Sequence, residues 1–108
     1  MPVTTPEAAT LAALEAKAEE AARFLSLLAN ERRLLILCHL ATRGEMKVSA
    51  LAEAVDLSQS ALSQHLAKLR EDGLVAFRRE SQTLFYRLDD PRAARLLATL
   101  KDIFCPAL

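Results

Sequence analysis

Apolar residues recur at steps of three and four along most of this 108-residue chain, and that period predicts a mainly helical protein. A chain of this length forms one domain with a modest core. Pro6 suits the first turn of the first helix. The expected helices cover residues 7–28, 31–42, 50–55, 59–72 and 91–104.

Capping residues set the predicted helix boundaries. Asn30, Ser49 and Ser58 each precede an expected helix, and their side chains are of the kind that accepts a hydrogen bond at a helix N-terminus. Gly44 and Gly73 stand where the second and fourth helices should end, because glycine readily adopts the left-handed conformation that follows a helix.

Two segments switch to the alternating pattern of β-strands. In Leu74–Glu80 and Thr83–Leu88 apolar side chains occupy every second position, and Ser81-Gln82 between them is expected to form a hairpin tip. Lys47–Val48 is expected to be a shorter extended piece. A helix, a tight turn and a second helix followed at once by a hairpin form a winged helix-turn-helix. The fold class is therefore mainly α with a small β-hairpin.

The segment 49–72 meets the physical requirements of a helix-turn-helix. Ala52 is small where the second helix crosses the first closely, and Asp56-Leu57-Ser58 forms the tight turn, in which Asp tolerates a left-handed backbone. With Leu62 directed to the core, the second helix, around Ser58–Glu71, turns five polar side chains outward or to the flank: Gln59, Ser60, Ser63, Gln64 and Lys68.

These short polar side chains suit DNA. Gln can bond an adenine edge twice and Ser can bond bases or phosphates, whereas Lys68, further along the helix, suits a phosphate. The same face would also suit a solvated surface helix, and the neighbouring turn and hairpin favour DNA recognition. His65 lies nearer the core stripe and is expected to be a boundary residue rather than a base contact.

The hairpin provides the second expected contact with DNA, because a wing lies along the phosphate backbone or enters the minor groove. This assigns three residues to DNA binding: Arg78, Gln82 and Thr83. Arg79 ranks below them because it is placed to pair with Glu80 or Glu71. The alternative interpretation is a solvated hairpin decorated with charge.

Composition narrows the function classes. The chain has 14 basic and 14 acidic residues, so a basic surface requires local segregation, and residues 60–88 hold five basic residues against three acidic ones. No apolar stretch is long enough to span a membrane. Met1–Thr5 lacks the features of a signal peptide, so a cytoplasmic location is expected. No glycine-rich phosphate loop, nucleophile triad or paired carboxylates appear, so an enzyme is not expected.

Three runs resemble the ArsR/SmtB family of bacterial transcriptional repressors: LLANERRLLILCHL (27–40), LSQSALSQHLAKLREDGLVAFRRE (57–80) and QTLFYRL (82–88). The resemblance implies a single domain over 1–108 in which helices 6–28 and 91–105 form a homodimer interface, residues 49–72 the helix-turn-helix and 74–88 the wing. It also implies that two winged helices read a palindromic, double-stranded operator, and that an effector lowers the affinity for it.

Many members of this family sense metals, but the residues used for that purpose are missing here. The short helix that carries a cysteine cluster in some relatives reads Val48-Ser49-Ala50-Leu51-Ala52, and the last expected helix has no histidine. His39 and His65 are the two histidines of the chain, so the four ligands of a tetrahedral zinc site cannot be assembled convincingly. No metal and no cofactor are therefore expected.

The two cysteines differ in their local setting. Cys38 is predicted to be a small buried side chain, on an apolar stripe of its helix with three other residues: Leu34, Leu37 and Ala41. Pro106 should end the last helix near Phe104, so periodicity does not locate the Cys105 thiol. In the cytosol both thiols are expected to be reduced rather than joined in a constitutive disulfide.

With both metal sites missing, Cys38 and Cys105 resemble the dithiol, BigR/SqrR/YgaV/HlyU-like subgroup of the family. That resemblance implies a persulfide sensor: reactive sulfur species, or sometimes oxidants, join the two thiols by a disulfide or polysulfide bridge and disfavour DNA binding. Two alternatives stay open: a regulator whose cysteines do not switch, and a non-standard metal site formed by both cysteines, with or without His39.

Overall fold

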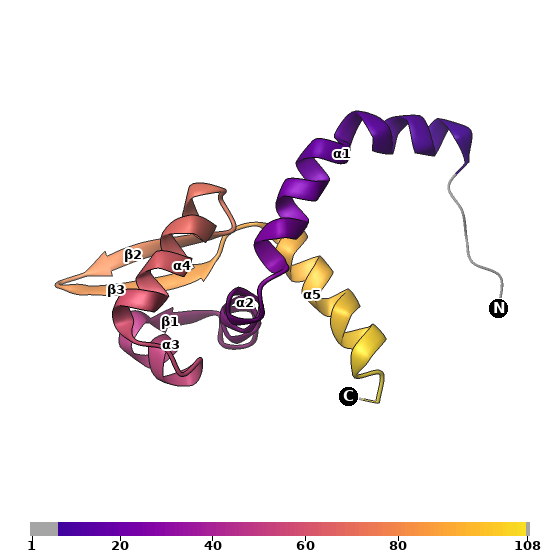
Figure 1. Ribbon diagram of the computed structural model, residues 1–108. Coiled ribbons are helices and arrows are strands. Elements are labelled where there is room, and N and C mark those ends of the chain that lie inside the picture. Colours follow the sequence, from indigo (N-terminus) through magenta and orange to yellow (C-terminus); the bar gives the residue numbers. More distant parts are fainter. Residues whose placement is uncertain (1–6, 108) are drawn as a thin grey trace.

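The computed structural model describes residues 7–107, which form five helices and a three-stranded antiparallel sheet (Figure 1). In chain order the elements are α1 (Ala8–Leu28), α2 (Glu31–Arg43), β1 (Glu45–Lys47), α3 (Val48–Ala54), α4 (Gln59–Glu71), β2 (Val75–Glu80), β3 (Thr83–Leu88) and α5 (Pro91–Phe104). The predicted winged helix-turn-helix is confirmed. Pro6, predicted in the first turn of the first helix, lies outside the described residues.

Side-chain caps fix the beginnings of α2 and α4. The Asn30 side chain accepts a hydrogen bond from the Arg33 backbone N–H at 3.0 Å. The Ser58 hydroxyl accepts one from the Ala61 N–H at 3.2 Å. Both predicted caps are confirmed, and each satisfies a backbone donor that the first helical turn leaves unpaired.

Strand β1 runs directly into helix α3. Its residues Glu45–Lys47 pair with β3, and Lys47 is the N-cap residue of α3 without a side-chain hydrogen bond. The prediction that Ser49 caps this helix is therefore wrong, and of the expected extended piece Lys47–Val48 only Lys47 lies in a strand. Pairing with the hairpin decides where β1 ends, and a three-residue strand leaves little alternation in the sequence to reveal it.

The sheet has the order β1-β3-β2, so β3 pairs with both of its neighbours. The register places Met46 and Phe77 on either side of Tyr86. Met46 and Tyr86 are buried, and the Phe77 and Tyr86 ring centres lie 5.4 Å apart. The predicted hairpin with Ser81-Gln82 at its tip is confirmed, and β1 adds a third strand that the sequence pattern did not place in the sheet.

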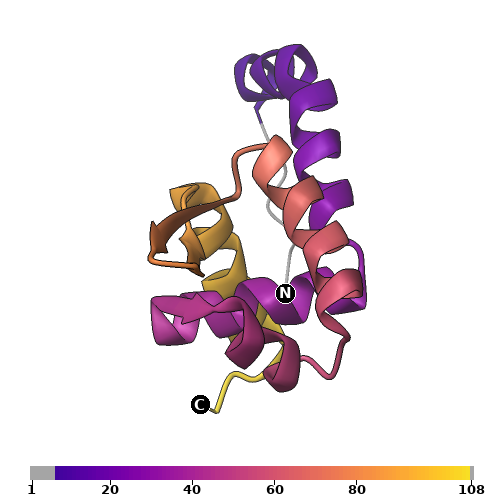
Figure 2. The same cartoon turned by 90° about the vertical axis from the view of Figure 1, so that its left-hand side faces the viewer.

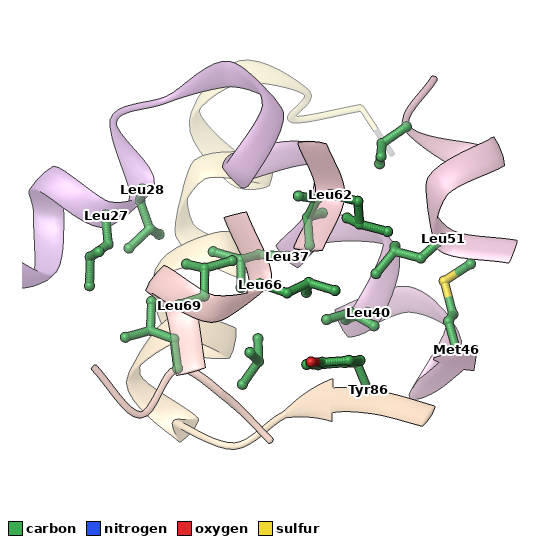
Figure 3. Packing of buried hydrophobic residues seen from close by; sticks show 14 of the residues in the cluster. Leu27, Leu28, Leu37, Leu40, Met46, Leu51, Leu62, Leu66, Leu69 and Tyr86 are labelled. Atoms are coloured by element: carbon green, nitrogen blue, oxygen red, sulfur yellow. The ribbon is translucent and has the colours of Figure 1, made fainter. Parts of the chain in front are cut away.

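The core lies where α4 packs over α2 and the sheet (Figure 3). Leu62, Leu66 and Leu69 of α4, spaced four and three residues apart, are at most 1% exposed, which confirms the predicted buried stripe. They share one buried cluster with residues of α2, α3 and the sheet: Ile36, Leu37, Leu40, Leu51 and Tyr86.

Helix α2 buries a different face from the predicted one. Of the expected stripe, Leu37 is buried, but Leu34 and Cys38 are half-buried and Ala41 is exposed. The buried residues of α2 are Ile36, Leu37 and Leu40. Because α2 contacts α1, α3, α5 and the sheet, several neighbours together decide which side is covered, and Cys38 lies at the edge of the buried face.

The turn between α3 and α4 is built on a left-handed residue. Asp56 has a φ of 55°, as its place in the turn predicted. The Leu57 N–H donates to the Ala52 carbonyl at 3.0 Å, and the Asp56 N–H donates to the Glu53 carbonyl at 3.3 Å. These two hydrogen bonds form a Schellman motif, which ends α3 and aims the chain into α4.

Asp56→Gly is expected to raise the free energy of unfolding by about 0.5–1 kcal/mol, because glycine adopts this conformation without the steric penalty of a Cβ atom. Urea denaturation measures the difference. Asp56→Ala is the control and should lower stability, since alanine keeps the Cβ and loses the polar side chain that tolerates this region. Equal stability of all three proteins would show that the turn carries no strain at this residue.

Helix α1 projects away from the rest of the molecule (Figure 1). The chain measures 52 × 33 × 20 Å with a radius of gyration of 16.0 Å, whereas a compact domain of this length has about 13 Å. Of the apolar stripe predicted for α1, Leu28 is buried, but Leu11, Leu14 and Leu25 are about half exposed. This face of α1 is therefore left uncovered by its own chain. Among residues 7–107, no helix has the length and apolar character required to cross a membrane.

Candidate nucleic-acid interface and cysteine pair

Helix α4 and the β2–β3 hairpin, which is the wing, lie on the same side of the molecule (Figure 2). The five residues predicted to contact DNA from this helix are all exposed: Gln59, Ser60, Ser63, Gln64 and Lys68. Burial of the leucine stripe on the opposite side fixes the rotation of the helix and keeps this face outward. An exposed helix beside a β-hairpin is the arrangement in which a recognition helix enters a DNA groove.

A groove of about 380 Å³ lies between the beginning of α4, the tip of the wing and the beginning of α3. The structure brings four of the predicted residues together around it: Gln59, Ser63, Gln82 and Thr83. The other predicted residues of α4 lie outside its lining. Lys47 and Ser49 also line the groove, although they were not predicted. The signal available in the sequence was a cation, Lys47, just before the helix-turn-helix and a hydroxyl, Ser49, at its first residue.

Arg78, predicted to contact DNA, is held by acidic neighbours. Its Nε and Nη2 atoms donate to the Glu45 carboxylate at 2.8–3.1 Å. Its Nη1 atom donates to Glu80 at 2.8 Å, and its guanidinium lies 4.4 Å from the centre of the Phe85 ring. These hydrogen bonds lower the pKa of Glu45 and raise that of Arg78. Arg78 thus links β2 to β1 across the middle strand.

Arg79 lies next to Arg78 but has a different environment. The expected pairing of Arg79 with Glu80 or Glu71 is wrong, because Glu80 pairs with Arg78 and Arg79 has no ion pair among the described residues. Successive strand residues point to opposite faces, which separates the two arginines. Arg79 is exposed and therefore is the arginine of β2 with an uncompensated charge.

Replacing Arg79 with alanine is expected to reduce the slope of log affinity for a DNA duplex against log salt concentration by about 1, because one phosphate contact is lost. Arg78→Ala is the matched control. It should lower thermal stability by removing the link to Glu45, and it should change the salt slope less. Fluorescence anisotropy at several salt concentrations gives the slopes. A slope change confined to Arg78→Ala would contradict this assignment.

The prediction that His65 is a boundary residue is confirmed. Its side chain is half-buried on α4. Burial lowers the pKa of the imidazole, and the positive charge of Arg33 lowers it further. Both effects favour a neutral, half-buried ring over a charged side chain offered to a phosphate.

Cys38 is sheltered but reachable from the surface. It is half-buried at the edge of the core, and burial raises the pKa of its thiol. A surface pocket beside it is lined by residues of the same helix: Leu35, His39, Thr42 and Arg43. A raised thiol pKa keeps Cys38 mostly protonated near neutral pH, where it is a poor nucleophile.

Cys105 lies at the end of α5, whose predicted last residue, Phe104, is confirmed. Its backbone N–H donates to the Lys101 carbonyl at 2.7 Å, and its side chain is exposed. Both cysteines are free thiols, and the helices that carry or precede them, α2 and α5, are in contact. Within residues 7–107, no group of three histidine, cysteine or carboxylate side chains could hold a metal ion.

Iodoacetamide is expected to alkylate Cys105 before Cys38 at pH 7, because the thiolate is the reacting form and burial keeps Cys38 protonated. As pH rises, the Cys38 rate should keep increasing above about 8.5, where an ordinary thiol is half ionised. Mass spectrometry of the two cysteine peptides follows both rates. Equal rates at pH 7 would show that the Cys38 thiol is not sheltered.

The polar face of α4, the wing and the groove between them define the class of protein as a winged helix-turn-helix transcriptional regulator that binds DNA. Residues 30–76 match the family model described as bacterial regulatory protein, arsR family. Because a bacterial transcriptional activator is also 43% identical over 99% of this chain, the chain belongs to the ArsR family.

Three relatives illustrate the similarity. The transcriptional activator HlyU of Vibrio cholerae is 43% identical over 107 residues, which are 99% of this chain and 98% of HlyU. The structure of the transcriptional repressor BigR of Xylella fastidiosa matches with a TM-score of 0.83 and 40% identity, covering 89% of this chain and 97% of BigR. The homodimeric winged helix-turn-helix domain Mb0332 of Mycobacterium bovis matches with a TM-score of 0.72 and 36% identity, covering 93% of this chain and 89% of that domain. The chain falls in the BigR/HlyU subgroup.

Proposed function

We propose that this chain is a homodimeric repressor that binds a palindromic operator and releases it when Cys38 and Cys105 are linked in response to persulfides or polysulfides. The observation that carries the proposal is a pair of free thiols associated with two helices in contact, α2 and α5. Helix α2 also lies in the core beneath the reading helix α4, so a change at this pair reaches the DNA-binding side.

The groove accounts for the DNA contacts of one protomer. Gln59 and Ser63 lie at the beginning of α4, the end of a recognition helix that meets base edges. Gln82 and Thr83 at the tip of the wing, with Lys47 at the edge of the groove, suit phosphates. Arg79 adds an unpaired positive charge. Three other residues of α4 extend the reading face: Ser60, Gln64 and Lys68.

A second copy of the chain is the proposed partner of α1 and α5. Leu11 and Leu14 of α1 and Ile103 and Phe104 of α5 are 49–76% exposed, an apolar area that a monomer would leave in water. Burying it stabilises a dimer by about 25 cal/mol for each Å² covered. The homodimeric relative Mb0332 supports this arrangement. The two copies of α4 would then reach half-sites about one DNA turn apart.

The two thiols suit a stepwise reaction. The exposed Cys105 thiolate attacks the outer sulfur of a persulfide, RS–SH, and gives a Cys105 persulfide and the thiol RSH. The Cys38 thiolate then attacks Sγ of Cys105, the inner sulfur of that persulfide, which forms the Cys38–Cys105 disulfide and releases the outer sulfur as hydrogen sulfide. The two cysteines are oxidised, and the transferred sulfur leaves as sulfide. A longer polysulfide donor would leave sulfur atoms in the bridge, which relaxes the Cα separation of about 4.4–6.8 Å that a direct disulfide requires.

Wild-type protein is expected to lose about 5–150-fold in operator affinity after treatment with glutathione persulfide, the range of a typical allosteric coupling. The probe is a palindromic duplex selected by the reduced protein from a random-sequence DNA pool. Dithiothreitol should restore binding. Mass spectrometry identifies the bridge, because a disulfide removes two hydrogens and each retained sulfur adds its own mass.

Cys38→Ser and Cys105→Ser are the controls, and both should keep their operator affinity after treatment. If Cys38→Ser loses affinity as much as wild type, the dithiol switch is refuted. If wild type keeps its affinity, the alternative of a regulator with non-switching cysteines applies. A metal titration followed by native mass spectrometry separates the other alternative, a metal site that uses both cysteines, with or without His39.

A further inference from the structure

The projecting helix α1 is held at its C-terminal end. Arg33 of α2 donates to the carbonyl of Leu27 at 2.8 Å and to that of Ser26 at 3.3 Å, which satisfies acceptors that the end of α1 leaves unpaired. Leu27 and Leu28 are buried in the core. This end is therefore a fixed point about which the rest of α1 is oriented.

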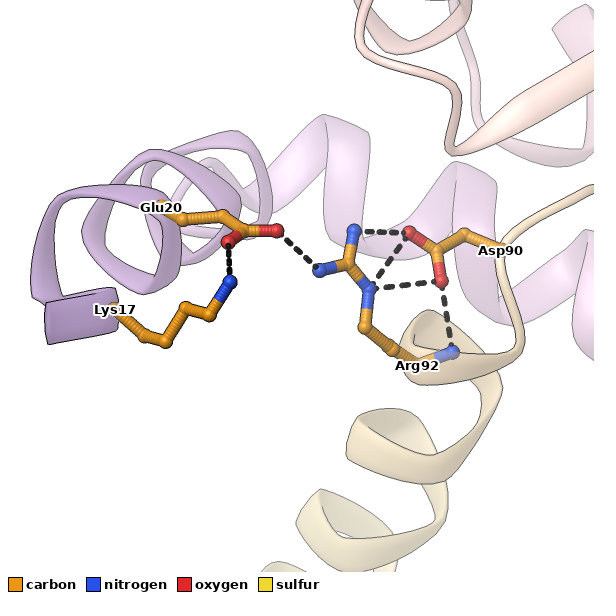
Figure 4. Close-up of polar contacts among 4 residues, drawn as sticks. All are labelled: Lys17, Glu20, Asp90 and Arg92. Carbon is orange, nitrogen blue, oxygen red and sulfur yellow. Dashed lines mark hydrogen bonds and ion pairs between the residues drawn. The ribbon is translucent and has the colours of Figure 1, made fainter. Parts of the chain in front are cut away.

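A second contact connects α1 to the beginning of α5 (Figure 4). Arg92 of α5 donates to Glu20 of α1 at 3.3 Å, and its guanidinium lies 5.0 Å from the centre of the Phe24 ring. The same guanidinium is held at 2.7 Å by Asp90, the N-cap residue of α5. Arg92 is thus already oriented by its own helix when it contacts α1.

A third contact joins α1 directly to the reading helix. The Nε and Nη2 atoms of Arg23 donate to one carboxylate oxygen of Asp72 at 2.9 and 2.7 Å. Asp72 is the C-cap residue of α4, and its side chain is 20% exposed. A carboxylate at a helix C-terminus is unfavourable beside the negative end of the helix dipole, and Arg23 offsets that repulsion.

We infer that Arg23 is a positioning residue for DNA recognition, which acts through Asp72 to set the angle between the dimerisation helix α1 and the reading helix α4. In the proposed homodimer, on which this inference rests, that angle sets the distance between the two copies of α4. Arg23 thereby determines which separation of operator half-sites the dimer accepts.

The length of α1 gives this contact a large effect. From Arg23 to Ala8 the helix follows a path of about 22 Å at a rise of about 1.5 Å per residue, and it bends along that path (Figure 1). Because the N-terminal part of α1 lies far from Arg23, a modest rotation at the base displaces it by a distance comparable with the rise of about 3.4 Å between successive base pairs. A loss of angular restraint at Arg23 is therefore sufficient to change the separation of the reading helices on the scale of a base pair.

The test compares wild type with Arg23→Ala on the selected palindromic duplex and on two derivatives, one with a base pair added between the half-sites and one with a base pair removed. Wild type should bind both derivatives much more weakly than the parent. Arg23→Ala should bind the parent about 3–10-fold more weakly, and its discrimination against the derivatives should shrink by at least about threefold. Arg95→Ala, which removes an exposed arginine of α5, controls for the lost positive charge.

The double variant Arg23→Asp with Asp72→Arg reverses the pair and also places a cation at the C-terminus of α4, where the dipole favours it. It should restore the wild-type preference for spacing. Thermal unfolding and sedimentation confirm that each variant is folded and dimeric. The inference is overturned if folded, dimeric Arg23→Ala discriminates among the three duplexes as wild type does. It is also overturned if the reversed pair does not restore the preference for the parent separation of half-sites. A monomeric wild type, or one that selects no palindrome, would instead refute the proposed function.

Discussion

Burial of the leucine stripe of α4 in the core that it shares with α2 fixes the DNA-binding face of this protein. Leu62, Leu66 and Leu69 occupy one side of a thirteen-residue helix, and truncating such a residue to alanine typically costs about 2–5 kcal/mol. With that side buried, the Gln and Ser residues of the opposite side have no alternative to facing outward. Hydrogen bonds at both ends of α4 then set its limits, through Ser58 at the beginning and through the left-handed Gly73 just beyond Asp72.

The sequence predicted the elements of this fold well because their signals are local. Helical periodicity located α4 and α5 almost to the residue, and the caps Asn30 and Ser58 act as their residue types suggest. The exposed face of α4 followed directly from its leucine spacing. Strand β1 was missed as part of the sheet because its three residues are held by pairing with β3, a partner forty residues further along the chain.

The functional details that the sequence missed depend on tertiary neighbours. Arg78 and Arg79 are adjacent arginines that the sequence alone does not distinguish. Only the strand order of the sheet brings Glu45 of β1 close to Arg78. Likewise Cys38 was predicted on a buried stripe of α2, but the neighbours of α2 cover a different face of the helix and leave the thiol at the edge of that face. A thiol at an edge is the more useful one for a sensor, because a fully buried thiol would be closed to its effector.

Helix α2 has three structural roles, which involve different residues of the same helix. It supports the leucine stripe of α4, it carries the Cys38 thiol, and through Arg33 it holds the end of α1. A bridge from Cys38 to the end of α5 would act on the helix to which both the reading surface and the projecting helix are attached. Protein cores are close-packed and deform little, so a shift of α2 relative to α5 cannot be absorbed locally. The shift of α2 would instead change the angle of α1, the least restrained helix. Beyond its buried end, α1 is held by ion pairs such as Arg23 with Asp72 and Arg92 with Glu20.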